Sequence, residues 1–531
     1  MCNTSQIAAR FSFLQFVSAA LLTISLTLTA CAADYSIVAT GSPYGNSYAV
    51  VVSKATYAQK DWRGVADALV RKHAATLVIY DGAVAESRTA LSAKMPRFTA
   101  FVARPEECGR DYIAEVHRLT RRLDDDPWLD TQWGVITGAD ASQALRVASV
   151  TAPLEIKKVL TTTHLNSALF DDYFVIGDGR QSDTWLWKKA DGTTEQGTPQ
   201  ASAAGSIGVL RNSASTFGND HAAQWAKHLE MNPDLVVSSA HGYENGLEMP
   251  FSRGIVRVVN GKLYPIPSVR QQVPSPGTAP IGESSNSKVY FPLGNCLIGH
   301  VNGQHCMVTT MMGPYGVNQL AGYTVNTWFG RGGWGMLGVW QTLPGRNSFG
   351  ESFFFNQQGM LRDIAAIDPK ALDYKIRLGS GNVEIEGHIR DMIGAGLKFD
   401  PRKTNPSRGG TKSPDYQLAG LLWDIDTVAF YGDPAWRAVL NSEKEPRFLT
   451  TGLVSNGNTH TFTVEILNET VAAQNSTPIG VIFTTRLKNV KILSGQEYEP
   501  VVADNFILLF NPRPKAGEKE IVVKFSGEPV K

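Results

Sequence analysis

Hydrophobic and polar positions in the first third of the chain follow two alternating patterns. Short runs rich in Val, Ile and aromatic residues predict buried strands at 48–52, 74–80, 98–102 and 133–136. The segments between them carry apolar residues at helical spacing and predict helices at 62–72, 112–123 and 141–147. Strands that alternate with helices are typical of a layered α/β domain, so we expect a mostly parallel sheet.

The middle of the chain continues this pattern with longer connections. Asp172 to Gly179 predicts a strand that ends in a turn, and 219–230 predicts a short helix. The segment 184–204 is polar and predicts a surface excursion. The segment 271–287 is rich in Pro, Gly and Ser, which indicates a flexible loop that could face a substrate or serve as a lid. Val317 to Thr327 predicts a further helix.

From about residue 445 the pattern changes to short strands separated by Asn, Gly and Pro turns. We expect these strands at 448–454, 459–467, 480–485, 490–493, 506–510 and 520–525. Such a run predicts a small antiparallel β-sandwich of immunoglobulin-like size over residues 445–531. The α/β domain then occupies residues 31–444, either as one unit or as two subdomains, 35–180 and 181–444.

Size and composition agree with this division and exclude several functions. A chain of 531 residues is too long for one ordinary domain, and 43% hydrophobic residues suffice for packed cores. The net charge is only +1, and no basic stretch is long or interleaved with aromatic residues, so we expect no nucleic-acid partner. Neither a P-loop nor a dinucleotide-binding fingerprint occurs.

The first 31 residues predict a processing signal. Arg10 precedes an apolar stretch over 11–28, and the sequence Leu28-Thr29-Ala30-Cys31 resembles a bacterial lipobox. This resemblance implies a lipoprotein signal peptide over 1–30, a lipid on Cys31, and a protein exported to the cell envelope and anchored to a membrane. Ala32 favours the outer membrane. The alternative is ordinary cleavage at the small residues Ala30 to Ala32, which gives a secreted protein.

Two segments combine a buried strand with a chemically active side chain at its end. The sequence Asp-Leu-Val-Val-Ser-Ser-Ala-His-Gly ends at Gly242 and presents His241. The sequence Lys-Val-Tyr-Phe-Pro-Leu-Gly-Asn-Cys ends at Cys296. If the two strands are parallel neighbours, both side chains emerge at the carboxyl edge of the sheet, where open α/β sheets bind ligands.

A thiol next to an imidazole forms a nucleophile with its base. Only a small part of an ordinary cysteine is thiolate at neutral pH, and a neighbouring imidazole can accept the thiol proton. Gly242 lets its backbone N–H approach a substrate, and with the N–H of Cys296 it would form an oxyanion-binding pair. Gly294 and Asn295 would provide the sharp turn that exposes the thiol.

Other interpretations of these residues remain open at this point. Two of the five cysteines, Cys2 and Cys31, lie in the targeting region, and an odd number remains for the rest of the chain. Cys296 could be a buried small hydrophobe, or could form a disulfide with Cys306, which would remove the nucleophile. A further alternative is zinc held by a clustered set of side chains, although the spacing matches no familiar zinc site and we predict no metal there. The members of that set are Cys296, His300, His305 and Cys306.

The two motifs resemble the caspase-like superfamily of cysteine peptidases, and in particular the gingipain family. Ala240-His241-Gly242 and Asn295-Cys296 end apolar strands in the family's order, 55 residues apart. Phe430 to Pro434 contains the Gly-Asp-Pro ending common in gingipain-type catalytic domains, and the β-rich tail resembles the immunoglobulin-like domain that follows them. The Gln-Ala-Cys pattern of caspases is absent, because Gly294-Asn295-Cys296 stands in its place.

The resemblance implies a caspase-like α/β fold and an exported cysteine endopeptidase that acts on peptide or protein substrates. Cys296 would be the nucleophile, His241 the general base and acid, and Gly242 an oxyanion donor; Asp178 is the candidate acid that supports the histidine. No cofactor is required, and structural calcium is implied only by the resemblance. The alternative function is a non-catalytic binding lipoprotein that presents a groove on the same scaffold.

Overall fold

The computed structural model describes residues 47–177, 184–197, 221–379, 381, 383–398, 400–404, 413–441, 448–472, 475–510 and 512–530. The predicted signal peptide over 1–30, the lipidation site Cys31 and the candidate acid Asp178 lie outside the described residues. Within the described ranges, no helix combines the length and the apolar character that crossing a membrane requires.

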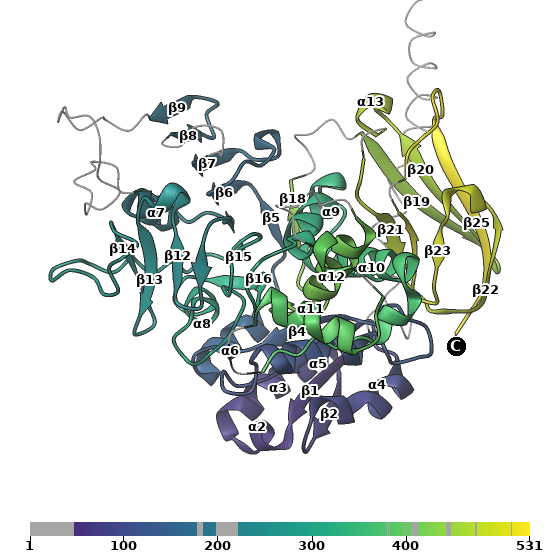
Figure 1. Ribbon diagram of the computed structural model, residues 1–531, viewed down its shortest axis with the longest axis horizontal. Coiled ribbons are helices and arrows are strands. Elements are labelled where there is room, and N and C mark those ends of the chain that lie inside the picture. Colours follow the sequence, from purple (N-terminus) through teal and green to yellow (C-terminus); the bar gives the residue numbers. More distant parts are fainter. Residues whose placement is uncertain are drawn as a thin grey trace, which may run out of the picture.

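One twisted sheet of twelve described strands organises the α/β part, and it runs from the purple strands to the blue strands of Figure 1. In spatial order the strands are β2 (Thr76–Tyr80), β1 (Tyr48–Ser53), β3 (Phe98–Val102), β4 (Gln132–Ile136), β17 (Val428–Tyr431), β16 (Val317–Tyr323), β15 (Lys288–Phe291), β10 (Leu235–Val237), β6 (Lys158–Thr161), β7 (Asp172–Ile176), β8 (Trp185–Lys188) and β9 (Thr194–Gly197).

Ten of the twelve described strands form two parallel runs. Strands β2, β1, β3, β4 and β17 are parallel neighbours, and so are β16, β15, β10, β6 and β7. The two runs meet where β17 pairs antiparallel with β16. The mostly parallel α/β sheet expected from the sequence is therefore confirmed. The division into subdomains 35–180 and 181–444 stays a prediction, and the seam of the sheet lies elsewhere.

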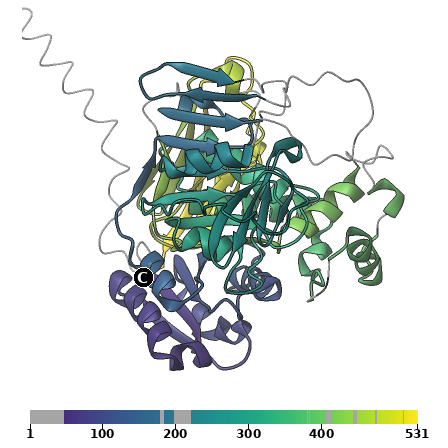
Figure 2. The ribbon, with the colours of Figure 1, turned by 90° about the vertical axis from the view of Figure 1, so that its left-hand side faces the viewer.

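Helices pack beside this sheet, and the longer ones bury an apolar face. They are α2 (Lys54–Ala58), α3 (Lys60–His73), α4 (Arg88–Lys94), α5 (Arg110–Thr120), α6 (Ala141–Ser149), α7 (His221–Glu230), α8 (Met307–Met312), α9 (Met336–Thr342), α10 (Phe349–Ile367), α11 (Ile385–Gly394), α12 (Pro414–Asp424) and, in the C-terminal part, α13 (Glu469–Ala472). In α3, for example, Trp62, Val65 and Leu69 are buried while Lys60, Asp61 and Arg63 are exposed. Figure 2, which is turned by 90° from Figure 1, shows helices beside the stacked strands.

The segment 317–327 is not a helix, so that prediction was wrong. Residues Val317–Tyr323 form strand β16, which is buried along its whole length between β15 and β17. Its polar residues have partners in the core: the Gln319 side-chain amide donates to the carbonyls of Asp433 and Trp436 at 2.8 and 3.0 Å. Tertiary pairing on both sides outweighs the local pattern here.

The polar segment 184–204 does more than loop over the surface. Its described part, 184–197, folds into the antiparallel hairpin of β8 and β9 and extends the sheet beyond β7. A second small sheet stands over the same end of the large sheet, with strands β11 (Gly242–Tyr243), β12 (Gly246–Glu248), β13 (Ile255–Val259) and β14 (Lys262–Ile266). The strand pair β5 (Leu154–Ile156) and β18 (Ala438–Leu440) completes the α/β part.

The C-terminal residues form two antiparallel sheets, coloured yellow-green to yellow in Figure 1. One contains β19 (Leu449–Asn456), β20 (Thr459–Ile466), β25 (Glu520–Pro529) and β22 (Leu487–Ser494), and the other contains β21 (Ile479–Ile482), β24 (Phe506–Leu509) and β23 (Val501–Val502). Apolar side chains of both sheets, such as Phe462, Val523 and Ile507, share one buried cluster. The predicted antiparallel strands are therefore present and packed face to face, while the boundary at residue 445 stays a prediction.

The Gly-Asp-Pro motif has a structural role. Asp433 is buried at the end of β17, where its carboxylate accepts hydrogen bonds from Tyr48, Lys72 and His73 at 2.7 to 2.8 Å. Burial alone would raise the pKa of Asp433, but the His73 hydrogen bond and the two cationic neighbours outweigh it and lower the pKa to about 2. This carboxylate joins the two ends of the α/β segment of the chain.

Candidate active site

A cavity of about 530 Å³ lies at the carboxyl ends of five neighbouring parallel strands. It is lined by Gly177 after β7, Thr162 and Thr163 after β6, Ser239, Ala240 and His241 after β10, Gly294 and Cys296 after β15, and Thr327 after β16. Met249, Pro250, Phe251 and Ser252, which follow β12, close it from the small sheet. The carboxyl edge of the parallel strands is where ligand sites of open α/β folds form.

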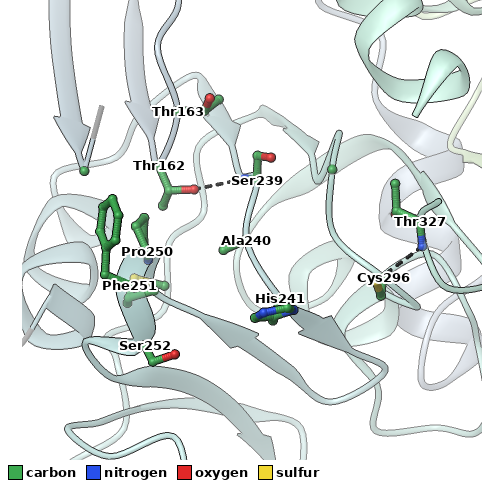
Figure 3. Close-up of a pocket in the computed structure, with 13 residues that line it drawn as sticks. Thr162, Thr163, Ser239, Ala240, His241, Pro250, Phe251, Ser252, Cys296 and Thr327 are labelled. Carbon is green, nitrogen blue, oxygen red and sulfur yellow. Dashed lines mark hydrogen bonds between the residues drawn. The ribbon is translucent and has the colours of Figure 1, made fainter. Parts of the chain in front are cut away.

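The cavity brings together the two side chains that the sequence singles out. Strands β10 and β15 pair in parallel, with Val236 opposite Tyr290, so the loops beyond them leave from one edge. His241 and Cys296 both line the cavity that results. In Figure 3, Phe251 and Ser252 stand on one side of the cavity, Cys296 on the other, and His241 between them.

The turn around Cys296 exposes its thiol while holding it at a defined position. Cys296 is free and half-buried, and its Sγ accepts a hydrogen bond from the backbone N–H of Thr327 at 3.3 Å (Figure 3). Leu297, the next residue, adopts a left-handed backbone conformation with φ of 61°, which is costly for a branched apolar residue. This hydrogen bond links the cysteine turn to the segment that follows β16.

The histidine loop fits closely against the cysteine turn because residue 242 is glycine. A Cβ on Gly242 would lie 2.7 Å from the carbonyl oxygen of Cys296 and 2.9 Å from Cβ of Asn295. Just before it, His241 is exposed, and in the described part of the chain no hydrogen bond reaches its imidazole. The backbone N–H of Glu248 donates to the carbonyl of His241, which makes 242 and 247 a non-hydrogen-bonded pair and directs the Gly242 N–H away from β12.

Asn295 joins the two loops and was only partly understood from the sequence. Its side chain is fully buried; the amide N–H donates to the carbonyl of Ala240 at 2.8 Å, and its oxygen accepts the hydroxyl of Ser238 at 2.7 Å. The residue before the thiol therefore positions the residue before His241. The sequence indicated a turn at Asn295, but nothing in it identified this partner across 55 residues.

The wall opposite the thiol comes from a strained segment that sequence reasoning missed. Phe251 and Ser252 both have left-handed backbone conformations, with φ of 59° and 58°. The segment is closed by the hydrogen bonds from Met249 N–H to the Gly254 carbonyl and from Ser252 N–H to the Met249 carbonyl. Phe251 remains 52% exposed beside the cavity. Its only sequence signal was the Pro250 and Gly254 pair that encloses it.

The structure does not assemble the alternative zinc set. His305 lines a different cavity, whereas His300 is held by Glu244 at 3.1 Å and by Arg110 at 2.9 Å. The hydrogen bond with His300 lowers the pKa of Glu244. Cys306 is buried, which raises the pKa of its thiol, and it is free, so no disulfide removes Cys296.

Three carboxylates elsewhere in the described ranges approach one another closely. Oxygen atoms of Asp124, Asp126 and Asp130 all lie within 4.8 Å of each other, next to the C-terminal sheets. Burial is the main cause that raises the pKa of Asp126 to about 7 and of Asp130 to about 9, and Asp124 adds to both shifts. An acidic cluster alone does not define a metal site, so structural calcium stays a prediction.

Comparisons with known proteins give little beyond this geometry. No family model matches the chain, and no curated protein matches it. Among solved structures, gingipain R, an Arg-specific cysteine proteinase, matches with a TM-score of 0.34 at 9% identity, over 92% of this chain and 98% of that chain. A structure described as a protease matches with a TM-score of 0.34 at 10% identity, over 92% and 99%. Similarity this distant decides nothing about activity.

Proposed function

We propose that this protein is a cysteine peptidase that hydrolyses peptide bonds through an acyl-enzyme. The observation that carries the proposal is that Cys296 and His241 line one open cavity at the carboxyl ends of two adjacent parallel strands. A free, half-buried thiol and an exposed imidazole beside a cavity of about 530 Å³ have the composition of a nucleophile, its base and a substrate site.

The proposed reaction begins when the Cys296 thiol proton moves to His241 and the sulfur attacks the carbonyl carbon of the scissile bond. The C–N bond of the tetrahedral intermediate then breaks, and His241 returns the proton to the leaving amine. A water molecule, deprotonated by His241, attacks the thioester; the acid product leaves and the thiol is regenerated. The Thr327 N–H, 3.3 Å from Sγ, supports the sulfur whenever it carries negative charge.

The oxyanion of each tetrahedral intermediate needs preorganised donors. We assign this role to the N–H groups of Gly242 and Cys296. Two features support the assignment: the Gly242 N–H points away from β12, and the backbone of Gly242 lies against the carbonyl of Cys296. A glycine is needed there because any Cβ would meet that carbonyl oxygen.

The proposed location and attachment follow from the sequence alone. The lipobox-like residues before Cys31 favour an exported protein, anchored in the cell envelope through lipid on that cysteine. Metabolic labelling with a palmitate analogue tests the anchor, because replacing Cys31 with Ala should abolish incorporation. Labelling that survives this substitution, or a protein released without lipid, would reject it.

The peptidase proposal is tested by comparing the wild type with Cys296→Ala and Cys306→Ala. We expect Cys296→Ala to abolish cleavage of a mixed peptide library and labelling by a thiol-directed peptide probe. Cys306→Ala, which alters a buried thiol outside the cavity, should retain both. Undiminished cleavage by Cys296→Ala would refute the assignment, and a folded wild-type protein without cleavage or labelling would favour the binding lipoprotein instead.

A further inference from the structure

The cavity next to the thiol differs from its surroundings in charge. Apart from His241 and Cys296, none of the described residues that line it is ionisable; the others are glycine, alanine, proline, serine, threonine, methionine and phenylalanine. A second cavity of about 460 Å³ on the same protein contrasts with it. That cavity is lined by charged side chains that include Asp140, Arg146, Lys262 and Glu283.

Two described carboxylates close to the cavity in sequence, on Glu248 and Glu244, are engaged elsewhere. Glu248 on β12 is buried, and its Oε1 accepts the Tyr243 hydroxyl at 2.9 Å. Glu244 binds His300 and lies 4.0 Å from Arg110. Neither glutamate lines the cavity. A cationic substrate side chain in the cavity would therefore meet hydroxyls, a thioether and aromatic carbon, but no counter-charge from the described residues.

The wall at Met249 to Ser252 has the construction of a specificity element. Its backbone holds two consecutive non-glycine residues at positive φ, Phe251 and Ser252, and such strain persists where the surrounding structure enforces it. Pro250 packs so closely that a Cβ on Gly177 would lie 2.8 Å from it. The wall presents a phenyl ring, a proline ring and a hydroxyl to the cavity at a fixed position, opposite Cys296 in Figure 3.

We propose that this cavity is the subsite for the side chain whose carbonyl Cys296 attacks, and that it selects an uncharged residue, apolar or hydroxyl-bearing. The inference rests on the peptidase function proposed above. An arginine, lysine, aspartate or glutamate side chain would lose its hydration on entry, and apart from His241 and Cys296 the described lining residues offer it no opposite charge. An uncharged side chain would gain apolar contact with Met249 and Phe251.

The test uses the full mature chain and fluorogenic peptides that differ only at the residue before the scissile bond. We expect kcat/KM for Met, Phe or Thr at that position to exceed kcat/KM for Arg, Lys, Asp or Glu by about 100-fold or more. Equal or faster cleavage after any of the four charged residues would overturn the inference while the peptidase function stands. If no peptide is cleaved and iodoacetamide modifies Cys296 no faster than free cysteine, the peptidase proposal itself fails.

A designed change of specificity makes the assignment of the wall testable. Ser252→Asp places a carboxylate on the cavity wall, and Ser252→Asn is its matched neutral control; both residue types tolerate the left-handed backbone at this position. We expect Ser252→Asp to raise kcat/KM for the Arg peptide by at least about 10-fold relative to Ser252→Asn. An unchanged rank order of substrates in Ser252→Asp would show that the wall does not contact this side chain.

Discussion

Replacing Asn295 with Asp tests whether the cysteine turn and the histidine loop are held together by a single side chain. The substitution keeps the shape of the side chain but removes the N–H that donates to the Ala240 carbonyl at 2.8 Å, and it leaves two oxygens facing each other in a fully buried site. The oxygen that accepts the Ser238 hydroxyl is retained. The perturbation therefore acts on the contact between the cysteine turn and the histidine loop.

The magnitude follows from the hydrogen bond that is lost and the carbonyl that is left unpaired. A net hydrogen bond contributes about 1 kcal/mol, and an unsatisfied buried acceptor costs about 1–3 kcal/mol, so the joined arrangement should lose about 2–4 kcal/mol. If the histidine loop can move away to hydrate Ala240, the population with His241 beside Cys296 falls by the same free energy. We expect kcat/KM to fall by roughly 30- to 900-fold.

Three measurements separate this effect from general unfolding. The first is kcat/KM on the best peptide, the second is the rate constant for alkylation of Cys296 by iodoacetamide at pH 7, and the third is the melting temperature. Ser238→Ala is the matched control, because it removes the other partner of Asn295 but leaves the bond to Ala240, and it should stay within a few-fold of the wild type. Full activity of Asn295→Asp at an unchanged melting temperature would refute the reasoning.

Two further predictions concern the glycine at the site and the buried Asp433 carboxylate at the end of β17. Gly242→Ala should lower kcat/KM by about 100-fold or more, because its Cβ would lie 2.7 Å from the Cys296 carbonyl oxygen. Gly64→Ala, in an open helix position, should instead stabilise the fold by about 0.5–1 kcal/mol. Activity assays and urea unfolding check both variants, and a fully active Gly242→Ala would count against the close approach. The pKa of Asp433 is about 2, below its unfolded value of about 3.9, so its contribution of about 2.6 kcal/mol is fully present above about pH 5 and is lost as the pH falls through 2. Asp433→Asn should therefore be less stable than the wild type by urea unfolding at pH 6, with a smaller difference at pH 2.5; a difference independent of pH would contradict this.

Much of the fold could be predicted because its elements carry strong local patterns. The runs of β1, β3 and β4 combine β-branched and aromatic residues, which favour a buried sheet. The segment that forms β16 could not be assigned in this way. Its sequence Val-Asn-Gln-Leu-Ala-Gly-Tyr has no alternation, and only the pairing with β15 and β17 makes it a strand.

In the candidate site, too, some features follow from local sequence patterns and others depend on tertiary contacts. Placing His241 and Cys296 at one sheet edge needed only the expectation that two apolar strands are parallel neighbours, which the pairing of β10 with β15 confirms. The contact between Asn295 and Ala240 could not be foreseen, because it depends on side-chain geometry across loops distant in sequence. The strained wall at Phe251 depends likewise on packing against β7.

By itself, the sequence determined that a thiol and an imidazole stand at the ends of two apolar strands, because strand periodicity and small-residue turns are local properties. The tertiary structure alone decided the order of the strands, the partner of Asn295 and the uncharged wall of the cavity. These depend on packing between distant segments, whose free energy no local pattern records. The surroundings of the Cys296 thiol are set only by the folded structure. If Cys296 and His241 prove not to react together with a substrate, the catalytic interpretation fails.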